Sequence, residues 1–190
     1  NLEQFVRKTP GIARVLTARD VPSNGFGIYP SIKDQPVLAD GEARFRGEAI
    51  AAVIGSREAI EALDASEFPV TWKELPPLLG LDAAMAPGAH LVQADKAGNV
   101  LLDGGVRKGD PDAAWRECAA VAEGSFETRF VEHAYIEPEA GWAQRVGNRI
   151  EVHVSTQTPY MDRGEVALVM KLSPSQVRIV PTACGGGFGG

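Results

Sequence analysis

The sequence predicts an α+β fold, and three features of its hydrophobic pattern support this class. A continuous apolar run at residues 49–54 is typical of a buried strand, and helical spacing of apolar residues follows it. Residues 149–154 alternate between polar and apolar side chains, as a strand with one buried face does. A third strand pattern leads directly into the glycine-rich residues 184–190. Helix and strand signals are therefore mixed along the chain.

The first half of the chain contains several short elements. Residues 12–16 form an apolar stretch, and the Pro-, Gly- and Asn-rich residues 21–31 predict a loop. The apolar run at 49–54 predicts a strand covered on both faces, and Ser56 is a suitable cap for the helix that follows. Residues 68–72 return to a strand pattern, so we expect a β-α-β unit here.

A polar, Gly-rich stretch at residues 95–110 predicts a connection between two structural units. We place the boundary near residue 90, which gives domains 1–90 and 91–190. Asp110-Pro111-Asp112 predicts a helix start, because a capping carboxylate precedes Pro at the first helical position. The buried stripe of this helix is predicted to be Ala114, Trp115, Cys118 and Ala119.

Strands dominate the remaining sequence and are predicted at residues 124–130, 141–146, 149–154 and 177–180. Gly147-Asn148 is expected to turn the two middle strands into a hairpin. Asp162 and Glu165 have the spacing of a capping box, so a short helix is predicted from Asp162 to Leu172.

Composition excludes several classes of protein. The formal net charge is −6 and no run of Lys or Arg occurs, so we expect no nucleic-acid partner. No apolar stretch approaches the roughly 20 residues that span a bilayer, so no membrane span is expected. The two cysteines, Cys118 and Cys184, are too few for a disulfide framework or an iron–sulfur site, which favours a reducing, cytoplasmic location. Because the first residue is Asn1, any targeting segment would lie upstream of it.

The final segment, Cys184–Gly190, places five glycines around the single aromatic Phe188. Glycine-rich backbone is a poor core former, but it lets amide N–H groups approach a ligand closely, and the aromatic ring offers a flat wall. A flexible tail is an alternative. Gly185-x-Gly187-x-x-Gly190 also matches the dinucleotide-binding fingerprint, although no helix or ribose-binding acid follows it.

Two further segments carry candidate polar groups. Gln157, in Ser155–Pro159, can donate its amide to an oxo or anionic ligand, or it is an ordinary solvated residue. The segment from Glu132 to Glu139 holds three acids and His133, but its spacing is not that of a zinc hydrolase. A buried hydrogen-bonded network that supports a nearby site is the favoured interpretation. His90 and His153 are predicted to be surface residues.

These segments, in this order, resemble the large subunit of the molybdenum hydroxylases, the xanthine dehydrogenase and aldehyde oxidase family. The motifs are Glu132-His133-Ala134-Tyr135-Ile136-Glu137-Pro138-Glu139, then Ser155-Thr156-Gln157-Thr158-Pro159, then Gly185-Gly186-Gly187-Phe188-Gly189-Gly190. Residues 40–53 and 72–77 are similar to the family's hammerhead domain. The resemblance implies a hammerhead-type α/β domain, followed by the beginning of a molybdenum-cofactor-binding α+β domain.

The resemblance also implies a function. In this family a molybdenum-pterin cofactor, molybdopterin or its cytosine dinucleotide form, hydroxylates an aldehyde or an N-heteroaromatic carbon with oxygen from water. Gln157 would hydrogen-bond the molybdenum oxo without ligating the metal, and Gly187, Phe188 and Gly189 would lie beside molybdenum and pterin. The family's catalytic glutamate lies downstream of the glycine-rich loop, so no catalytic residue is assigned and the isolated chain is expected to be inactive.

Expected partners are the remainder of the large subunit, iron–sulfur (2Fe-2S) and FAD subunits or domains, and a small-molecule substrate. Purines, nicotinate-like heterocycles, aromatic thioesters and aldehydes all remain open as substrates. The alternative function is a non-catalytic docking or assembly module, or a split subunit of such an enzyme.

Overall fold

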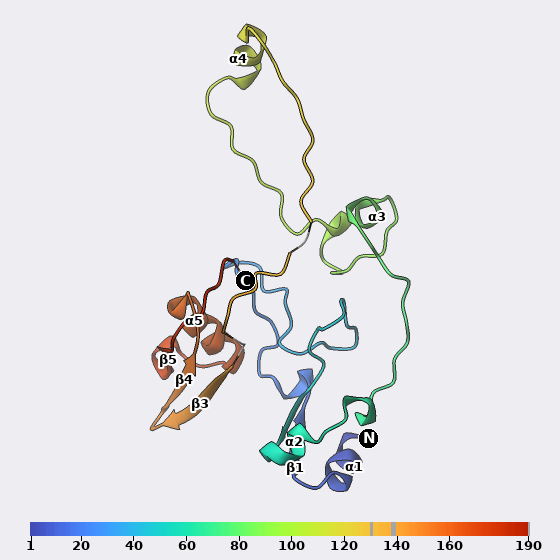
Figure 1. Ribbon diagram of the computed structural model, residues 1–190, viewed down its shortest axis with the longest axis vertical. Helices are drawn as coiled ribbons and strands as arrows, with labels where there is room; N and C mark the ends of the chain where they lie inside the picture. Colours follow the sequence, from blue (N-terminus) through green and yellow to red (C-terminus); the bar gives the residue numbers. More distant parts are fainter. Residues whose placement is uncertain (130, 138–139, 190) are drawn as a thin grey trace. The chain divides into compact units, whose positions relative to one another are not determined.

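The computed structural model of the chain describes residues 1–129, 131–137 and 140–189. Close contacts group the chain into two units, one formed by Asn1–Leu75 with Tyr135–Gly190 and the other by Pro76–Ala134. The first unit contains both sheets (Figure 1). Its helices and strands are α1 (Leu2–Lys8), β1 (Ile12–Leu16), η1 (Ala18–Asp20), β2 (Ala52–Gly55), α2 (Arg57–Glu61), η2 (Ala65–Glu67), β3 (Gly141–Val146), β4 (Arg149–Val154), α5 (Pro159–Met170), η4 (Pro174–Gln176) and β5 (Val177–Pro181).

The smaller sheet consists of β1 and β2, which pair antiparallel. Ser56 caps α2, because its Oγ accepts a hydrogen bond from the N–H of Ala59 at 3.3 Å, as predicted. The expectation of a strand covered on both faces is wrong, since β2 is the edge of a two-stranded sheet and Ile54 is 46% exposed.

The β-α-β unit predicted between residues 49 and 72 is also wrong. Residues 68–72 are described and form no strand. Phe68 instead packs edge-on against Phe5 of α1, with ring centroids 5.5 Å apart. Pro69 has no backbone N–H to donate to a neighbouring strand. Because no strand lies beside this segment in the described structure, its apolar pattern does not become a strand.

The larger sheet has the order β3-β4-β5. β3 and β4 form the predicted antiparallel hairpin, with Gly147 in the turn at φ +59°. β4 and β5 pair in parallel, with Ile150 opposite Val177 and Val154 opposite Pro181. Parallel neighbours require a crossover, and α5 supplies it (Figure 1). The carboxyl ends of β4 and β5 therefore lie at the same edge of the sheet.

The crossover helix α5 begins at Pro159, three residues before the predicted start. Thr158 is its N-cap residue and Pro159 occupies the first helical position, where a missing N–H costs nothing. The predicted capping box is wrong, because Asp162 already lies in the first turn and Glu165 pairs with a residue far away in sequence. The helix packs on β5, and Ala167 and Val177 are buried.

Glu165 ties α5 to the predicted loop region of the N-terminal half. Its carboxylate accepts a 2.6 Å ion-pair hydrogen bond from Lys33 Nζ and a 3.3 Å bond from the N–H of Gly27. Lys33 Nζ also donates to the carbonyl of Gly27 at 2.8 Å. Nearby, the Asn24 side chain both donates to and accepts from the backbone of buried Leu38. These contacts fix a long segment that lacks regular structure.

Asp20 closes the turn after β1. The N–H of Thr17 donates to Asp20 Oδ2 at 2.9 Å, and Arg14 Nη2 donates to Oδ1 at 2.8 Å. The hydrogen bond from the Thr17 backbone, followed by that from Arg14, lowers the pKa of Asp20 below its usual value.

The second unit contains α3 (Leu81–Met85), η3 (Ala97–Asn99) and α4 (Pro111–Glu117). Asp110 caps α4 as predicted, accepting a 3.0 Å hydrogen bond from the N–H of Ala113. The predicted buried stripe is wrong: Trp115 is 60% exposed, and Cys118 and Ala119 are also exposed. Residues 124–129 form no strand, and Phe130 lies outside the described residues. In the described part of this unit, no helix or strand packs over these apolar side chains.

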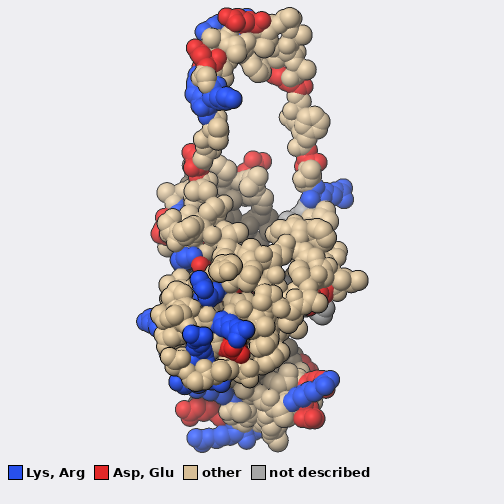
Figure 2. Space-filling view, turned by 90° about the vertical axis from the view of Figure 1, so that its left-hand side faces the viewer, with Lys and Arg blue, Asp and Glu red and all other residues tan. Residues whose placement is uncertain are grey.

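Much apolar surface remains uncovered. Large apolar side chains are exposed in both units, among them Tyr160 at 79% in the first and Leu81 at 79% in the second. On the face in Figure 2, charged side chains of both signs lie among wide uncharged areas. Such surface is typical of a polypeptide that packs against further protein. Among the described residues, no helix has the length and apolar character required to cross a bilayer.

Candidate functional site

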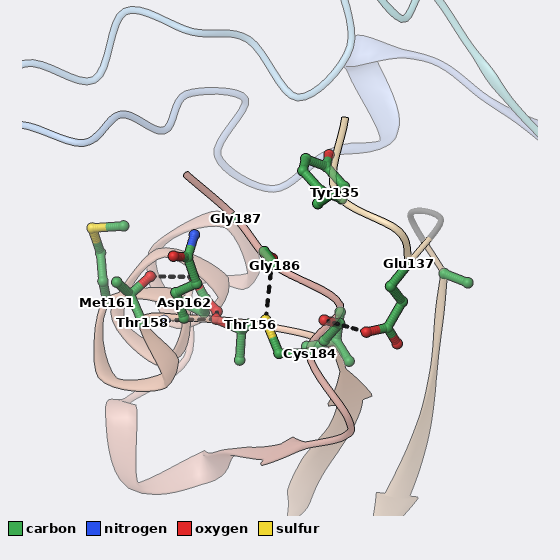
Figure 3. A pocket seen from close by; sticks show the side chains of 13 residues that line it. Tyr135, Glu137, Thr156, Thr158, Met161, Asp162, Cys184, Gly186 and Gly187 are labelled. Carbon is green, nitrogen blue, oxygen red and sulfur yellow. Dashed lines mark hydrogen bonds between the residues drawn. The ribbon is translucent and has the colours of Figure 1, made fainter. Parts of the chain in front are cut away.

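A polar cavity of about 270 Å³ lies at the carboxyl ends of β4 and β5 (Figure 3). Parallel strands commonly place ligand sites at this edge. The three segments singled out in the sequence meet here. Its lining residues are Tyr135, Glu137 and Ala140 from the first segment and the stretch that follows it, Val154–Thr158 from the exit of β4, Met161 and Asp162 from α5, and Cys184, Gly186 and Gly187 from the glycine-rich loop.

The exit of β4 is shaped by hydroxyl–carboxylate contacts. Thr156 Oγ1 donates to Asp162 Oδ2 and accepts a 2.9 Å hydrogen bond from the N–H of Thr158. Thr158 Oγ1 contacts the other oxygen of Asp162 at 3.5 Å. These bonds close a tight turn at the start of α5, and Gln157 lies at its tip with an exposed side chain.

The glycine-rich loop contacts Gln157 directly. A Cβ atom added to Gly187 would overlap the side-chain amide of Gln157, so a larger residue at this buried position requires that exposed amide to move. Gly186 and Phe188 both have positive φ angles, +128° and +55°, which turn the loop sharply. The Cys184 thiol donates to the carbonyl of Gly186 at 3.2 Å within this turn (Figure 3).

Glu137 connects the other two segments. Its Oε2 atom accepts a 3.1 Å hydrogen bond from the Ser155 hydroxyl and a 2.8 Å bond from the N–H of Gly185. The N–H of Ile136 donates to the carbonyl of Gly185 at 3.3 Å. Half-buried Glu137 is thus part of a hydrogen-bonded network, as expected in this segment, whereas Glu132 and His133 are exposed rather than buried. Pro138 and Glu139, from the same segment, lie outside the described residues.

The predicted cofactor-contacting residues differ in position. Gln157 and Gly187 line the cavity. Phe188 is 76% exposed, and neither it nor Gly189 belongs to the lining. Gly190 lies outside the described residues. His153, expected at the surface, is instead half-buried and stacks on Trp142 with ring centroids 3.8 Å apart, whereas His90 is exposed.

Several lining residues were not anticipated as part of a site. Thr156 and Thr158 flank Gln157, and Asp162 follows at a spacing that brings it back to both hydroxyls. A Thr-x-Thr-Pro sequence with an acid three residues after the proline is the local signal for this turn.

The lining residues carry amide, hydroxyl, carboxylate and thiol groups. Among the described residues, no group of three His, Cys, Asp or Glu side chains is placed to hold a metal ion. The carboxylates of Glu137 and Asp162 already accept hydrogen bonds from protein donors. Gln157, Gly186 and Gly187 also line the cavity, so a side-chain amide and glycine backbone lie there together.

This fold and pocket define a class: an α+β protein with a polar cavity at the carboxyl ends of adjacent parallel strands. Comparison with known families specifies it further. Residues 3–76 match the aldehyde oxidase and xanthine dehydrogenase a/b hammerhead domain, and residues 92–190 match the molybdopterin cofactor-binding domain. The chain belongs to the xanthine dehydrogenase and aldehyde oxidase family of molybdopterin-binding oxidoreductases. The predicted fold class is confirmed.

Individual relatives agree with this assignment. The chain is 37% identical over 188 residues to the nicotinate dehydrogenase large molybdopterin subunit of Eubacterium barkeri, covering 97% of this chain and 43% of that protein. It is 34% identical over 185 residues to a probable xanthine dehydrogenase subunit of Bacillus subtilis, covering 96% of this chain and 24% of the relative. The chain thus spans less than half the length of either relative.

Solved structures show the same fold. The aldehyde oxidoreductase of Desulfovibrio gigas superimposes with a TM-score of 0.80 at 25% identity, over 96% of this chain and 21% of that one. Quinoline 2-oxidoreductase of Pseudomonas putida 86 superimposes with a TM-score of 0.79 at 27% identity, over 100% of this chain and 25% of that one.

Proposed function

We propose that this chain supplies one wall of the molybdenum-cofactor pocket in a hydroxylase that oxidises an aldehyde or an N-heteroaromatic carbon with oxygen from water. Electrons would leave through iron–sulfur (2Fe-2S) and FAD centres on partner subunits or domains. The observation that carries the proposal is the convergence of three distant segments on one cavity, where the Gln157 amide lies against Gly187.

The residues present fit the implied cofactor. The closeness of Gly187 to Gln157 leaves no side chain between loop backbone and amide, so a large flat ligand could approach both. Gln157 would donate to the metal-bound oxo group, and Gly187 would present its backbone to the cofactor, with Phe188 and Gly189 following on the same loop. When bound, the molybdenum-pterin group, as molybdopterin or its cytosine dinucleotide form, supplies the two-electron redox chemistry that amino-acid side chains lack.

The catalytic base belongs to another part of the assembly. Glu137 and Asp162 are the carboxylates that line the described cavity, and each accepts hydrogen bonds from two protein donors. These hydrogen bonds tie both carboxylates to neighbouring segments, and the resemblance to the family implies a catalytic glutamate in another part of the subunit. The isolated chain is therefore proposed to be inactive, and the uncovered surface described above supports packing against the rest of the subunit.

Substrate class follows from the relatives only in outline. The names of the similar proteins mention nicotinate, xanthine, quinoline and aldehyde, and all of these except the aldehyde are N-heteroaromatic. The exposed, free Cys118 and Cys184 support a reducing, cytoplasmic location.

The proposal is tested in the complete subunit assembled with its partners. We expect stoichiometric molybdenum by elemental analysis and a Mo(V) signal on reduction. Gln157→Leu should lower kcat on the order of 10–100-fold, as losses of supporting groups at metal sites commonly do.

The matched control is Gln144→Leu on β3, whose amide bonds Glu151 at 3.3 Å and does not line the cavity. It should behave as the wild type. A wild-type assembly without molybdenum, or a Gln157→Leu variant no worse than the control, contradicts the proposal.

A further inference from the structure

We propose that Glu137 is a positioning residue, which holds the glycine-rich loop against the exit of β4 and thereby keeps Gly187 in contact with Gln157. This inference rests on the proposed function, since the pair it aligns is the one expected to meet the cofactor. Glu137 itself acts through its neighbours and need not touch substrate or cofactor.

The hydrogen bonds show how Glu137 joins separate segments. Ser155 is 18 residues away in sequence and Gly185 is 48 residues away, yet both donate to the same carboxylate oxygen, Oε2. Gly185 lies two residues before Gly187, and Ser155 lies two residues before Gln157. The bridge therefore sets the spacing between the two strand exits immediately before the residues in contact.

Packing at Gly185 supports the same conclusion. A Cβ added there would lie 2.6 Å from the backbone nitrogen and Cβ of Glu137, and 2.8 Å from Cγ2 of Ile136. The loop backbone is thus seated directly on this segment. The second bond, from the N–H of Ile136 to the carbonyl of Gly185, fixes the same residue through its other backbone polar group.

The charge of Glu137 has a structural explanation in this arrangement. The described residues that line the cavity include no Lys, Arg or His, so none of them supplies a cation to balance the carboxylate. The Ser155 hydroxyl and the Gly185 N–H stabilise the carboxylate by hydrogen bonds instead. Hydrogen bonds to a charged acceptor are stronger than those between neutral groups. A glycine-rich loop, which has high conformational freedom, gains most from such an anchor.

The alternative is that Glu137 only stabilises the fold in general. The two roles are distinguished by variants that keep or remove the hydrogen bonds accepted by Glu137 Oε2. Because both bonds end on one oxygen, the amide oxygen of Glu137→Gln can accept both, whereas Glu137→Ala removes both. Ser155→Ala removes one bond and leaves the loop bond intact, and it serves as a milder variant if Glu137→Ala fails to fold.

The experiment uses the complete assembled protein with Glu137→Ala, Glu137→Gln, Ser155→Ala and the control Glu151→Ala. Glu151 is a carboxylate of the same sheet that bonds Arg178 at 3.0 Å and lies outside the cavity lining. Amide hydrogen exchange of residues 183–189 is measured on cofactor-free protein. Molybdenum content, the Mo(V) spectrum and kcat against KM are measured on loaded protein.

We expect Glu137→Ala to raise exchange in residues 183–189 by about tenfold or more, the effect of losing one charge-assisted bond. It should also alter the Mo(V) spectrum and lower kcat more than it raises KM. Glu137→Gln should restore exchange and spectrum to within about threefold of the wild type, and Glu151→Ala should match the wild type.

Unchanged exchange in Glu137→Ala overturns the inference, as does a Glu137→Gln variant as damaged as Glu137→Ala. Hydrogen exchange on cofactor-free protein measures how firmly Glu137 holds the glycine-rich loop, independently of the cofactor. A wild-type assembly that lacks molybdenum but shows the exchange pattern therefore refutes the proposed function alone.

Discussion

Gly187 offers a sharp test of the pocket, because a Cβ there displaces the Gln157 amide. In Gly187→Ala the added methyl group overlaps the Gln157 amide, so the side chain or the loop must withdraw. Because the Gln157 side chain is exposed, it can swing aside, but its amide then leaves the position from which it would donate to the cofactor, and losing such a hydrogen bond costs about 1–3 kcal/mol. If the cost falls on the cofactor-binding geometry, cofactor affinity drops by roughly 5- to 150-fold, since about 1.4 kcal/mol corresponds to a factor of ten.

A second glycine on the same domain provides the control with the opposite sign. Gly164 lies inside α5, and a Cβ there would meet no atom within 4 Å. Gly164→Ala should therefore stabilise the helix by about 0.5–1 kcal/mol. The same chemical change is thus expected to harm one site and help the other.

The assay is molybdenum retention and thermal stability of the complete assembly for both variants. Gly187→Ala should lose cofactor faster than the wild type, whereas Gly164→Ala should retain it and unfold at a higher temperature. Equal cofactor retention in the two variants would refute the steric argument and, with it, the close approach of Gln157 to the loop.

Three other perturbations follow from contacts outside the cavity. Lys33→Met and Glu165→Gln should each lower the free energy of unfolding by about 1–3 kcal/mol. In a double-mutant cycle measured by denaturant titration, the double variant should lose less free energy of unfolding than the sum of the two single losses. Asn24→Ala leaves the N–H and carbonyl of Leu38 without their side-chain partner; it should cost about 1–3 kcal/mol and raise hydrogen exchange at that residue. The folded-state pKa of Asp20 is lowered. Its contribution to the free energy of unfolding is therefore present above about pH 4 and lost as pH falls through the folded-state pKa. Asp20→Asn should reduce the acid sensitivity of unfolding, and an unchanged acid titration would contradict this.

Local chemistry explains the elements that the sequence predicted well. Ser56 and Asp110 cap their helices because a short polar side chain reaches the free N–H groups of its own first turn. The strand at residues 149–154 and its hairpin partner follow from alternation and a glycine turn, which involve neighbours in sequence. Gln157 and Gly187 could be selected as site candidates because their residue types carry unusual chemistry at the ends of strands.

Non-local pairing decided what the sequence pattern could not. Residues 49–54 and 68–72 both carry strand-like patterns, but only part of the first found a partner, and the second packs through Phe68 on α1. Trp115 has helical spacing from other apolar residues, yet its side chain stays exposed in the described structure. Periodicity identifies which face of a segment is apolar, whereas burial depends on what else the fold places against that face.

The sequence alone determined the α+β class, the hairpin strands at residues 141–154, the caps at Ser56 and Asp110, the family resemblance and the order of its three motifs, since each depends on residue type and short-range spacing. Tertiary structure decided that β4 and β5 run in parallel, that α5 starts at Pro159, and that Glu137 joins Ser155 to Gly185. The physical reason is distance along the chain. A carboxylate can be recognised in a sequence, but the donors that it accepts from, 18 and 48 residues away, are chosen only when the sheet is assembled.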